Sequence, residues 1–370
     1  MFPYMNIKER IKRLVKGRPG KVKIGKQYVG PGEPVFVIAE IGINHNGDIT
    51  IAKKLIAAAK VAGADAVKFQ KRFTGEILTK EGRNAPYDSP NAFAPTYGEH
   101  RDKLEFGEKE YRELKQFAEG EGILFFASVW DRKSVDFMDT IGVDAYKIPS
   151  ADTTNLQLLD YVSRRGKPIL ISTGMSTEDE IDVAVSTVLK HTDKIILFHC
   201  LSLYPSPEEK INLRFMDVLK SRYSPLTVGY SGHEPDLLPT IAAVSRGAFI
   251  VERHFTLDKK MRGSDHAASL NPSELQELVA VIRRIEKILG APERIMYDEL
   301  KPLREKLAKS VATKVTIPAG AIITEDMLTV KGPGNGIAPS YMHTLIGRVA
   351  YTEIPEDSLV PKEALLWPRA

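Results

Sequence analysis

Residues 35–70 read VFVIAEIGINHNGDITIAKKLIAAAKVAGADAVKFQ, and this stretch predicts a strand, a helix and a second strand. The runs 35–40 and 66–70 are short and apolar, which is typical of buried parallel strands. Between them, residues 51–61 carry an alanine-rich face, and Gly63 follows as a stop signal. The stretch therefore reads as one β-α-β unit, in which a helix joins two parallel strands.

The same alternation continues along the chain to about residue 290. Six more strand-like runs follow, each after a segment of helical length, at residues 124–128, 145–148, 168–172, 195–200, 227–230 and 249–253. One of the intervening helices is expected at 177–189, with Ser176 as its N-cap. Eight such strands predict an α/β fold of the (β/α)8 TIM-barrel type over residues 31–290, close to the ~250 residues typical of that barrel. A doubly wound open sheet is the alternative.

Both ends of the chain differ from this central domain. Residues 1–30 are predicted to be a basic N-terminal extension and hairpin, and residues 291–310 a linker with a charged helical stretch at 302–309. Short β runs at 311–315 and 328–330, together with Gly332-Pro-Gly-Asn-Gly336, predict a small β-rich domain over 311–370.

The charge is concentrated in the N-terminal extension. Residues 1–30 carry a net charge of +8, against +4 for the whole chain, so the remaining residues sum to −4. This distribution gives no reason to expect nucleic acid as a partner. Ile7, Ile11, Leu14 and Val15 recur at helical intervals, which predicts a helix packed on the barrel or on a partner chain. An anionic membrane surface is the alternative site for this helix.

Other features narrow the class of protein. The composition, 43% hydrophobic and 27% charged, is ordinary for a globular protein. No export signal and no 18-residue apolar stretch is visible, so a cytoplasmic protein without a membrane span is expected. The single cysteine, Cys200, excludes an intrachain disulfide and a multi-cysteine metal site, and is expected to be a small buried side chain.

Polar residues stand at the expected carboxyl ends of all the predicted strands, where a TIM barrel places its active site. They include Glu40, Lys68, Gln70, Ser128, Lys147, Ser150, Ser172, Ser202, Tyr204, Ser231, His233, Glu252, His254 and Asp265.

Two pairs within this set indicate a chemistry. Burying Lys68 and Lys147 in strands costs several kcal/mol unless an anion compensates them, which predicts an anionic ligand. Lysines, hydroxyls and Gly174 at the start of a helix suit a phosphate and a carboxylate held together, and phosphoenolpyruvate carries both. His233 and His254, on neighbouring strands, are candidate ligands of one divalent metal ion.

The motifs resemble those of the sialic acid synthase family. They are Ala39-Glu-Ile-Gly-Ile-Asn-His-Asn-Gly47, Val67-Lys-Phe-Gln70, Tyr146-Lys-Ile-Pro-Ser150, Ile171-Ser-Thr-Gly-Met175, Gly229-Tyr-Ser-Gly-His233, Glu252-Arg-His-Phe-Thr-Leu-Asp258 and Gly263-Ser-Asp-His266. The resemblance runs from about residue 22 to the end, because the tail resembles the antifreeze-like SAF domain of that family.

The resemblance implies a role for each site residue. His233 and His254 would bind Mn²⁺ or Mg²⁺, which polarises the sugar aldehyde. The phosphate of phosphoenolpyruvate would be held by Lys68, Ser150, Ser172 and Ser231, and its carboxylate by Lys147 and Ser128. The sugar and the reacting centre would be surrounded by Glu40, Gln70, Tyr204 and Asp265, with Ser202 as a further ligand contact. Glu40 is the expected proton carrier.

The implied reaction is the condensation of phosphoenolpyruvate with an N-acyl-mannosamine-type sugar, N-acetylmannosamine or its 6-phosphate. Legionaminic or pseudaminic acid synthesis is an alternative, as are a synthase acting on another aldose and a non-catalytic carbohydrate-binding or ice-binding protein. The family also implies a homodimer that exchanges its SAF domains.

Four features bear on the substrate. Three positions differ from the pattern of some family members, which have Asn where this chain has Ser202, Glu where it has Asp152 and Arg where it has Gly332. In those members the resemblance implies that the Arg side chain reaches from the tail of one subunit to the sugar in the partner's site. Lys331 or Asn335 could substitute for it. The long connection at residues 71–107 resembles members that use the 6-phosphorylated sugar, so Arg101 and Lys103 either meet a sugar phosphate or solvate the loop.

Overall fold

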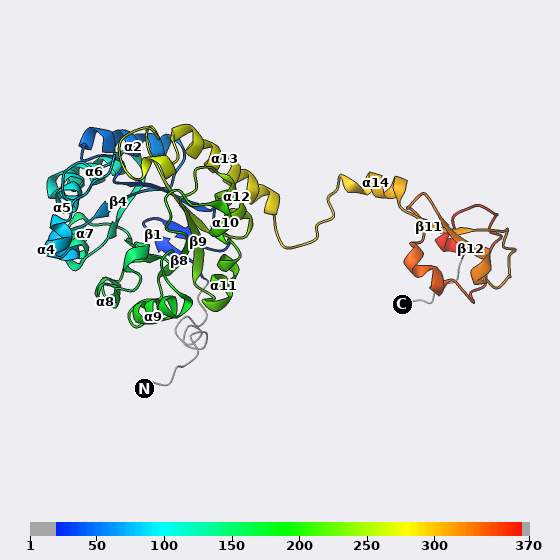
Figure 1. Ribbon diagram of the computed structural model, residues 1–370. Coiled ribbons are helices and arrows are strands. Elements are labelled where there is room, and N and C mark those ends of the chain that lie inside the picture. The colour runs from blue at the N-terminus through cyan, green and yellow to red at the C-terminus, as the bar shows by residue number, and fades with distance from the viewer. Residues whose placement is uncertain (1–19, 365–370) are drawn as a thin grey trace. The chain divides into compact units, whose positions relative to one another are not determined.

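The computed structural model describes residues 20–364 and divides into two compact units after Gly290 (Figure 1). The helix expected within residues 1–19 lies outside the described residues. None of the helices in residues 20–364 combines the length and the apolar character that a membrane span requires.

The first unit is a closed barrel of eight parallel strands in the order β10-β3-β4-β5-β6-β7-β8-β9. Pairing of β10 with β3 closes it and sets His254 opposite Glu40. The (β/α)8 prediction is therefore confirmed, and the open sheet is excluded. The strands are β3 (Phe36–Gly42), β4 (Ala66–Lys71), β5 (Leu124–Val129), β6 (Tyr146–Ile148), β7 (Ile169–Ser172), β8 (Ile195–Cys200), β9 (Thr227–Gly232) and β10 (Ile250–His254).

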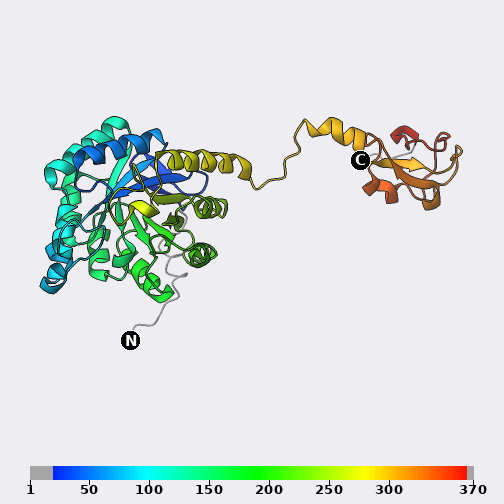
Figure 2. The same ribbon diagram turned by 45° about the horizontal axis from the view of Figure 1, so that its top comes forward.

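Helices surround the barrel and bury one apolar face each against it (Figure 2). In α2, for example, Ala52, Leu55, Ile56 and Ala59 are buried, at the spacing of one helix face. These helices are α2 (Ile49–Val61), α6 (Glu108–Glu121), α7 (Arg132–Ile141), α8 (Leu156–Ser163), α9 (Glu178–Val188), α10 (Glu208–Ile211), α11 (Phe215–Arg222), α12 (Leu238–Ser245) and α13 (Pro272–Leu289).

Two local predictions differ from the structure. The N-cap of α9 is Thr177, whose hydroxyl accepts from the Glu180 amide while the Glu180 side chain reaches back, so the prediction of Ser176 was wrong by one residue. The long connection after β4 is not structureless either. It contains α3 (Thr74–Ile77), α4 (Lys80–Asn84) and α5 (Tyr97–Lys103).

A short hairpin covers the amino-terminal end of the barrel. Strands β1 (Val22–Ile24) and β2 (Gln27–Val29) pair antiparallel, and Val22, Ile24 and Val29 join the barrel core. The Thr227 hydroxyl, at the start of β9, donates to the Gly20 carbonyl. The opposite, carboxyl-terminal end is thus the one available for a site.

The second unit has an apolar core of its own, which includes Val311, Ile323, Leu328, Leu345 and Ile354. It contains α14 (Leu300–Leu307) and the antiparallel pair β11 (Ser310–Thr313) and β12 (Leu328–Lys331). Short 3-10 helices complete the two units: η1 (Ser150–Asp152) and η2 (His266–Ala268) in the first, and η3 (Glu325–Met327), η4 (Pro339–Thr344) and η5 (Lys362–Ala364) in the second. The expectation of a small β-containing tail domain is confirmed.

Candidate active site

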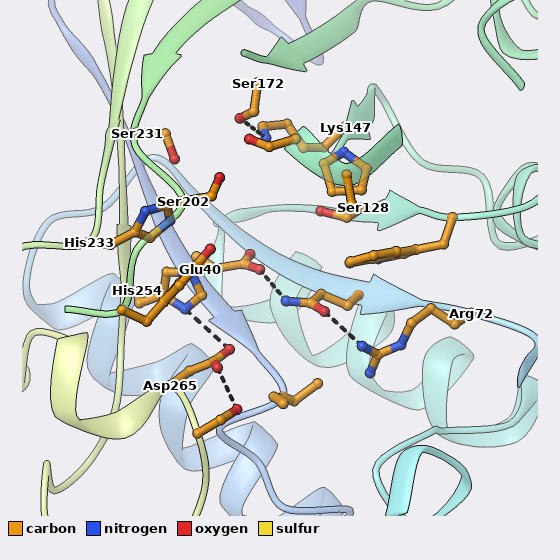
Figure 3. A pocket seen from close by; sticks show the side chains of 18 of the residues that line it. Glu40, Arg72, Ser128, Lys147, Ser172, Ser202, Ser231, His233, His254 and Asp265 are labelled. Carbon is orange, nitrogen blue, oxygen red and sulfur yellow. Dashed lines mark hydrogen bonds and ion pairs between the residues drawn. The ribbon is translucent and has the colours of Figure 1, made fainter. Parts of the chain in front are cut away.

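One pocket opens at the carboxyl ends of the barrel strands, and Figure 3 shows part of its lining. The structure brings all the predicted site residues together here, while their individual roles stay predictions. The predicted residues that line the pocket are Glu40, Lys68, Gln70, Ser128, Lys147, Ser150, Ser172, Ser202, Tyr204, Ser231, His233, His254 and Asp265.

Two lysines and two glutamates form a buried lysine–glutamate cluster in this pocket: Lys68, Lys147, Glu40 and Glu252. Each is at most 4% exposed. The Lys68 Nζ lies 2.7 Å from Glu40 Oε2 and 3.5 Å from Glu252 Oε1, and the Lys147 Nζ lies 3.8 Å from Glu252 Oε1. The two carboxylates therefore balance the two ammonium charges.

This balance corrects one step of the sequence analysis. The buried lysines were taken to need an anionic ligand, but Glu40 and Glu252 already supply the compensating charge. The remaining argument for an anionic substrate is that Lys68 and Lys147 face an open pocket rich in hydroxyl groups.

The two carboxyl groups of the cluster have pKa values shifted in opposite directions. Burial raises the pKa of Glu40 above its usual value, although Lys68 acts against this. Burial acts in the same sense on Glu252, but Lys147 and Lys68 outweigh it and hold the pKa of Glu252 below its usual value. Glu40 is consequently the carboxyl that more readily carries a proton, which is the property needed in general acid–base catalysis.

Serine hydroxyls hold the two lysines in place. The Lys68 Nζ donates to Ser128 Oγ at 2.7 Å, and the Lys147 Nζ donates to Ser172 Oγ at 2.5 Å. Each hydrogen bond joins a residue expected to bind the phosphate to one expected to bind the carboxylate. The two predicted sets of phosphoenolpyruvate ligands are therefore in direct contact. Ser150 Oγ in turn accepts from the Gly174 amide at 3.1 Å.

The two predicted metal ligands are neighbours, with ring centroids 5.3 Å apart. His233 Nδ1 donates to the Leu201 carbonyl at 2.7 Å, which leaves its Nε2 to face the pocket. His254 Nδ1 has no hydrogen-bond partner among the described residues and lies 3.6 Å from Asp265 Oδ2 (Figure 3). Such an orphaned, buried imidazole nitrogen fits a metal-ligand role.

The protonation of His233 also fits a divalent ion. Burial and the neighbouring His254 lower the pKa of His233 to about 3, so its imidazole is neutral, the form that ligates a metal. Residues 20–364 contain no ready cluster of three or more His, Cys, Asp or Glu for a metal. His233 and His254 stay the predicted protein ligands of the metal, to be completed by water or substrate oxygen atoms.

Comparison with known proteins identifies the family of the chain. A model described as the NeuB family matches residues 55–294, and one described as the SAF domain matches residues 308–366. The chain belongs to the NeuB family. This confirms the sialic acid synthase resemblance with a C-terminal SAF domain.

Relatives of this NeuB-family chain are synthases of different nonulosonic acids. The N-acetylneuraminate-9-phosphate synthase of Homo sapiens is 40% identical over 91% of this chain and 94% of that protein. The N,N'-diacetyllegionaminic acid synthase of Legionella pneumophila is 38% identical over 86% of this chain and 91% of that protein. A crystal structure of an N-acetylneuraminic acid synthetase from Leptospira borgpetersenii, in complex with citrate, is 34% identical with a TM-score of 0.68, and covers 77% of this chain and 95% of that one. The chain is thus a member of the nonulosonic acid synthase family.

Sequence reasoning missed several lining residues of the NeuB-family pocket. Glu252 was noted at a strand end but was not assigned to the site. Arg72 was not noted, although it continues the alternation of Lys68 and Gln70 directly beyond the end of β4. Trp130, which follows β5, also lines the pocket. The alternation was a signal that could have identified Arg72.

The long connection contributes to the pocket through α5. Arg101 lines the pocket, together with Tyr97 and His100 of the same helix. Lys103 is exposed and does not line it. Of the two basic residues considered as ligands of a sugar phosphate, Arg101 therefore stays a candidate and Lys103 does not.

The remaining expectations concern single residues. Cys200 is buried, and burial raises the pKa of its thiol, consistent with a packing role. Burial raises the pKa of Asp152 to about 6. In the second unit, Lys331 is ion-paired with Asp357, so its ammonium group is already engaged.

Proposed function

We propose that this chain is an N-acetylneuraminate synthase-type transferase, which condenses phosphoenolpyruvate with N-acetylmannosamine or its 6-phosphate. C3 of phosphoenolpyruvate forms a bond to the sugar aldehyde carbon, and water adds at C2. The tetrahedral intermediate then expels phosphate by cleavage of its C2–O bond, which leaves a nonulosonic acid. The observation that carries the proposal is the meeting, in one barrel pocket, of Lys68 and Lys147 with serine hydroxyls and with the imidazoles of His233 and His254.

The lysine-bearing part of the pocket suits the phosphoenolpyruvate. Lys68 with Ser150, Ser172 and Ser231 would hold the phosphate, and Lys147 with Ser128 the carboxylate. Both ammonium groups are buried, so their attraction for charge that develops on the departing phosphate is weakly screened by water. Glu40, beside Lys68, would move the proton of the attacking water or of the aldehyde oxygen.

The imidazole-bearing part suits the sugar. His233 and His254 would hold Mn²⁺ or Mg²⁺, which would supply the Lewis acidity to polarise the aldehyde oxygen. Gln70, Tyr204, Ser202 and Asp265 would orient the sugar hydroxyls. The Tyr204 ring packs 4.1 Å from the His233 ring, centroid to centroid, and so helps to fix that imidazole.

The test is phosphate release from phosphoenolpyruvate in the presence of Mn²⁺, with N-acetylmannosamine, its 6-phosphate and a diacetylated trideoxy sugar assayed in parallel. Phosphoenolpyruvate labelled with ¹⁸O at the bridging position should deliver the label to the released phosphate, because the C–O bond breaks. Release with the trideoxy sugar alone would favour the legionaminic or pseudaminic alternative. Label retained in the organic product would contradict the proposed cleavage.

We propose in addition that two chains associate as a homodimer with exchanged SAF domains. Exposed apolar side chains in the second unit support this, among them Tyr341 at 58% and Tyr351 at 67% exposure. Sedimentation equilibrium of the full chain and of a Tyr351→Glu variant would measure it. A monomeric wild type at micromolar concentration would contradict it.

A further inference from the structure

A second group of cations lies in the same pocket, apart from the lysine–glutamate cluster. Arg72 follows β4 directly and is only 1% exposed. Its Nε pairs with Glu105 Oε1 at 2.7 Å, and its Nη1 donates to Gln70 Oε1 at 3.1 Å. Its buried Nη2 donates to no residue in the described part of the chain. Figure 3 shows Arg72 on the side of the pocket away from His233 and His254.

Arg101 and Trp130 face the same region. The Arg101 guanidinium donates to the Tyr97 hydroxyl, but its buried Nε has no partner within residues 20–364. The indole Nε1 of Trp130 likewise finds no acceptor among them. The guanidinium carbons of Arg72 and Arg101 lie 5.6 and 5.8 Å from the centroid of the Trp130 ring. Three buried N–H donors in one part of the pocket thus have no acceptor among the described residues. Buried donors without acceptors lower the stability of the folded protein.

The cations of this region have few direct ion-pair partners. Glu105 pairs with Arg72 but also with Lys71, at 3.2 Å from its Nζ. Arg101 makes no ion pair with a described residue within 4 Å, and burial together with the nearby Arg72 lowers its pKa. Glu40 and Glu252 pair directly with the lysines of the other cluster, whereas here Lys71 and Arg72 share Glu105, and Asp265 acts on Arg101 without forming an ion pair with it. An added anion would give Arg101 a direct partner.

Strand β4 leads from the lysine–glutamate cluster to Arg72. Lys68 and Gln70 alternate in β4 and Arg72 follows its last residue, so the strand carries the chain about 10 Å beyond Lys68 before Arg72 begins. Gln70 connects the cluster with Arg72, since its Nε2 donates to Glu40 Oε1 at 3.1 Å and its Oε1 accepts from Arg72. A substrate that reacts near Lys68 and carries an anionic group at its far end could reach both the cluster and Arg72.

We propose that Arg72, Arg101 and Trp130 form an anion subsite that binds the terminal phosphate of a phosphorylated sugar and so selects the sugar 6-phosphate over the free sugar. This rests on the proposed function, whose sugar it specifies. A phosphate matches the subsite because its several oxygen atoms can accept from all three donors at once, and its double negative charge exceeds that of a carboxylate.

The experiment compares kcat/KM for N-acetylmannosamine 6-phosphate and for N-acetylmannosamine in the wild type, Arg101→Gln and Lys103→Gln. Both substitutions remove one positive charge from α5, but only Arg101 lines the pocket. The wild type should prefer the phosphorylated sugar, and Arg101→Gln should reduce that preference by about 10- to 100-fold, the usual effect of losing a charged hydrogen bond. Lys103→Gln should keep it. Trp130→Phe, which deletes one N–H donor, should reduce it by a smaller factor.

The outcomes separate the subsite from the proposed reaction. Turnover of both sugars with equal kcat/KM in the wild type would overturn the subsite and leave the reaction intact. If neither sugar releases phosphate, the reaction is wrong, and calorimetric titration with the same two sugars still decides the subsite. Weaker binding of the 6-phosphate to Arg101→Gln, but not to Lys103→Gln, would support the subsite. Equal binding of the 6-phosphate to both variants would overturn the subsite. Arg101→Lys, which keeps the charge, and the melting temperature of each variant control for misfolding.

Discussion

The lysine–glutamate cluster assigns different work to its two carboxylates. Glu252 lies within 3.8 Å of both lysines, whereas Glu40 pairs with Lys68 alone. Glu252 is therefore the shared counter-charge, and it keeps two cations buried without a ligand. Removing one partner of a buried ion pair leaves an uncompensated charge, which is costly to the folded state.

Replacing Glu252 with Gln should lower the free energy of unfolding by about 3–5 kcal/mol. Part of this loss should return when phosphoenolpyruvate is added, because its anionic groups replace the missing charge beside Lys68 and Lys147. Urea unfolding with and without phosphoenolpyruvate measures both effects, with the exposed Glu121→Gln as control. A full loss that phosphoenolpyruvate does not reduce would contradict the placement of its anions at the lysines.

Removal of either paired imidazole should weaken metal binding. His233→Ala and His254→Ala should each abolish turnover and reduce Mn²⁺ binding by at least about 10-fold, because each removes one of two protein ligands. Electron paramagnetic resonance of free Mn²⁺ measures the binding without recourse to activity. His343→Ala, an exposed histidine of the second unit, should bind Mn²⁺ as the wild type does. Unchanged binding in both pocket variants would remove the metal assignment.

A buried histidine outside the pocket predicts a pH-dependent stability. His45 is 2% exposed, stacks on Phe106 and accepts from the Gly47 amide through Nδ1. Burial and the nearby Arg72 lower its pKa to about 3. Below about pH 6.5 the unfolded chain gains a proton that the folded chain does not, so stability falls as the pH falls, by up to about 1.4 kcal/mol per unit.

His45→Asn keeps an acceptor near Gly47 but removes the titrating ring. It should lower stability at pH 7, and its unfolding free energy should fall less steeply than that of the wild type between pH 6.5 and 5. Urea unfolding across this range measures the slope, with the exposed His343→Asn as control. An unchanged slope in His45→Asn would show that this imidazole is charged in the folded protein.

At the scale of elements, the barrel strands were predictable and the pocket rim was not. Each strand is buried along its whole length or nearly so, and such strands appear in sequence as apolar runs that place strand ends to within about two residues. The candidate catalytic residues were predictable for the same reason, because they stand at or near the carboxyl ends of these strands. Short helices such as α5 have too few residues to show a period, so the approach of Arg101 and Trp130 to Arg72 depends on tertiary packing that no local pattern encodes.

The start of α9 offers a test of one local error. Thr177 caps the helix through a reciprocal capping box with Glu180, while the Ser176 hydroxyl is buried with no described partner. Thr177→Ala should therefore lower the unfolding free energy by about 1 kcal/mol. Ser176→Ala removes a hydroxyl that makes no bond and should cost nothing measurable. Denaturant unfolding of the two variants decides between the adjacent positions, and a larger loss for Ser176→Ala would return the cap to that residue.

At the scale of the molecule, the two units have separate apolar cores with no residue in common. The described residues that line the pocket all belong to the first unit. The barrel thus contains its own core, the lysine–glutamate cluster, Arg72 and Arg101, and the paired imidazoles. Because the barrel has an apolar core of its own, we expect it to fold without the tail.

A chain that ends at Gly290 should therefore unfold cooperatively and bind Mn²⁺ within about twofold of the full chain, because no described contact of the pocket is removed. It should also retain the weaker binding of N-acetylmannosamine 6-phosphate on Arg101→Gln substitution. Thermal unfolding, Mn²⁺ titration and calorimetry of the full and shortened chains, each at matched concentration, provide the comparison. Loss of Mn²⁺ binding in a shortened chain that still unfolds cooperatively would mean that the tail, from the same or a second chain, completes the site.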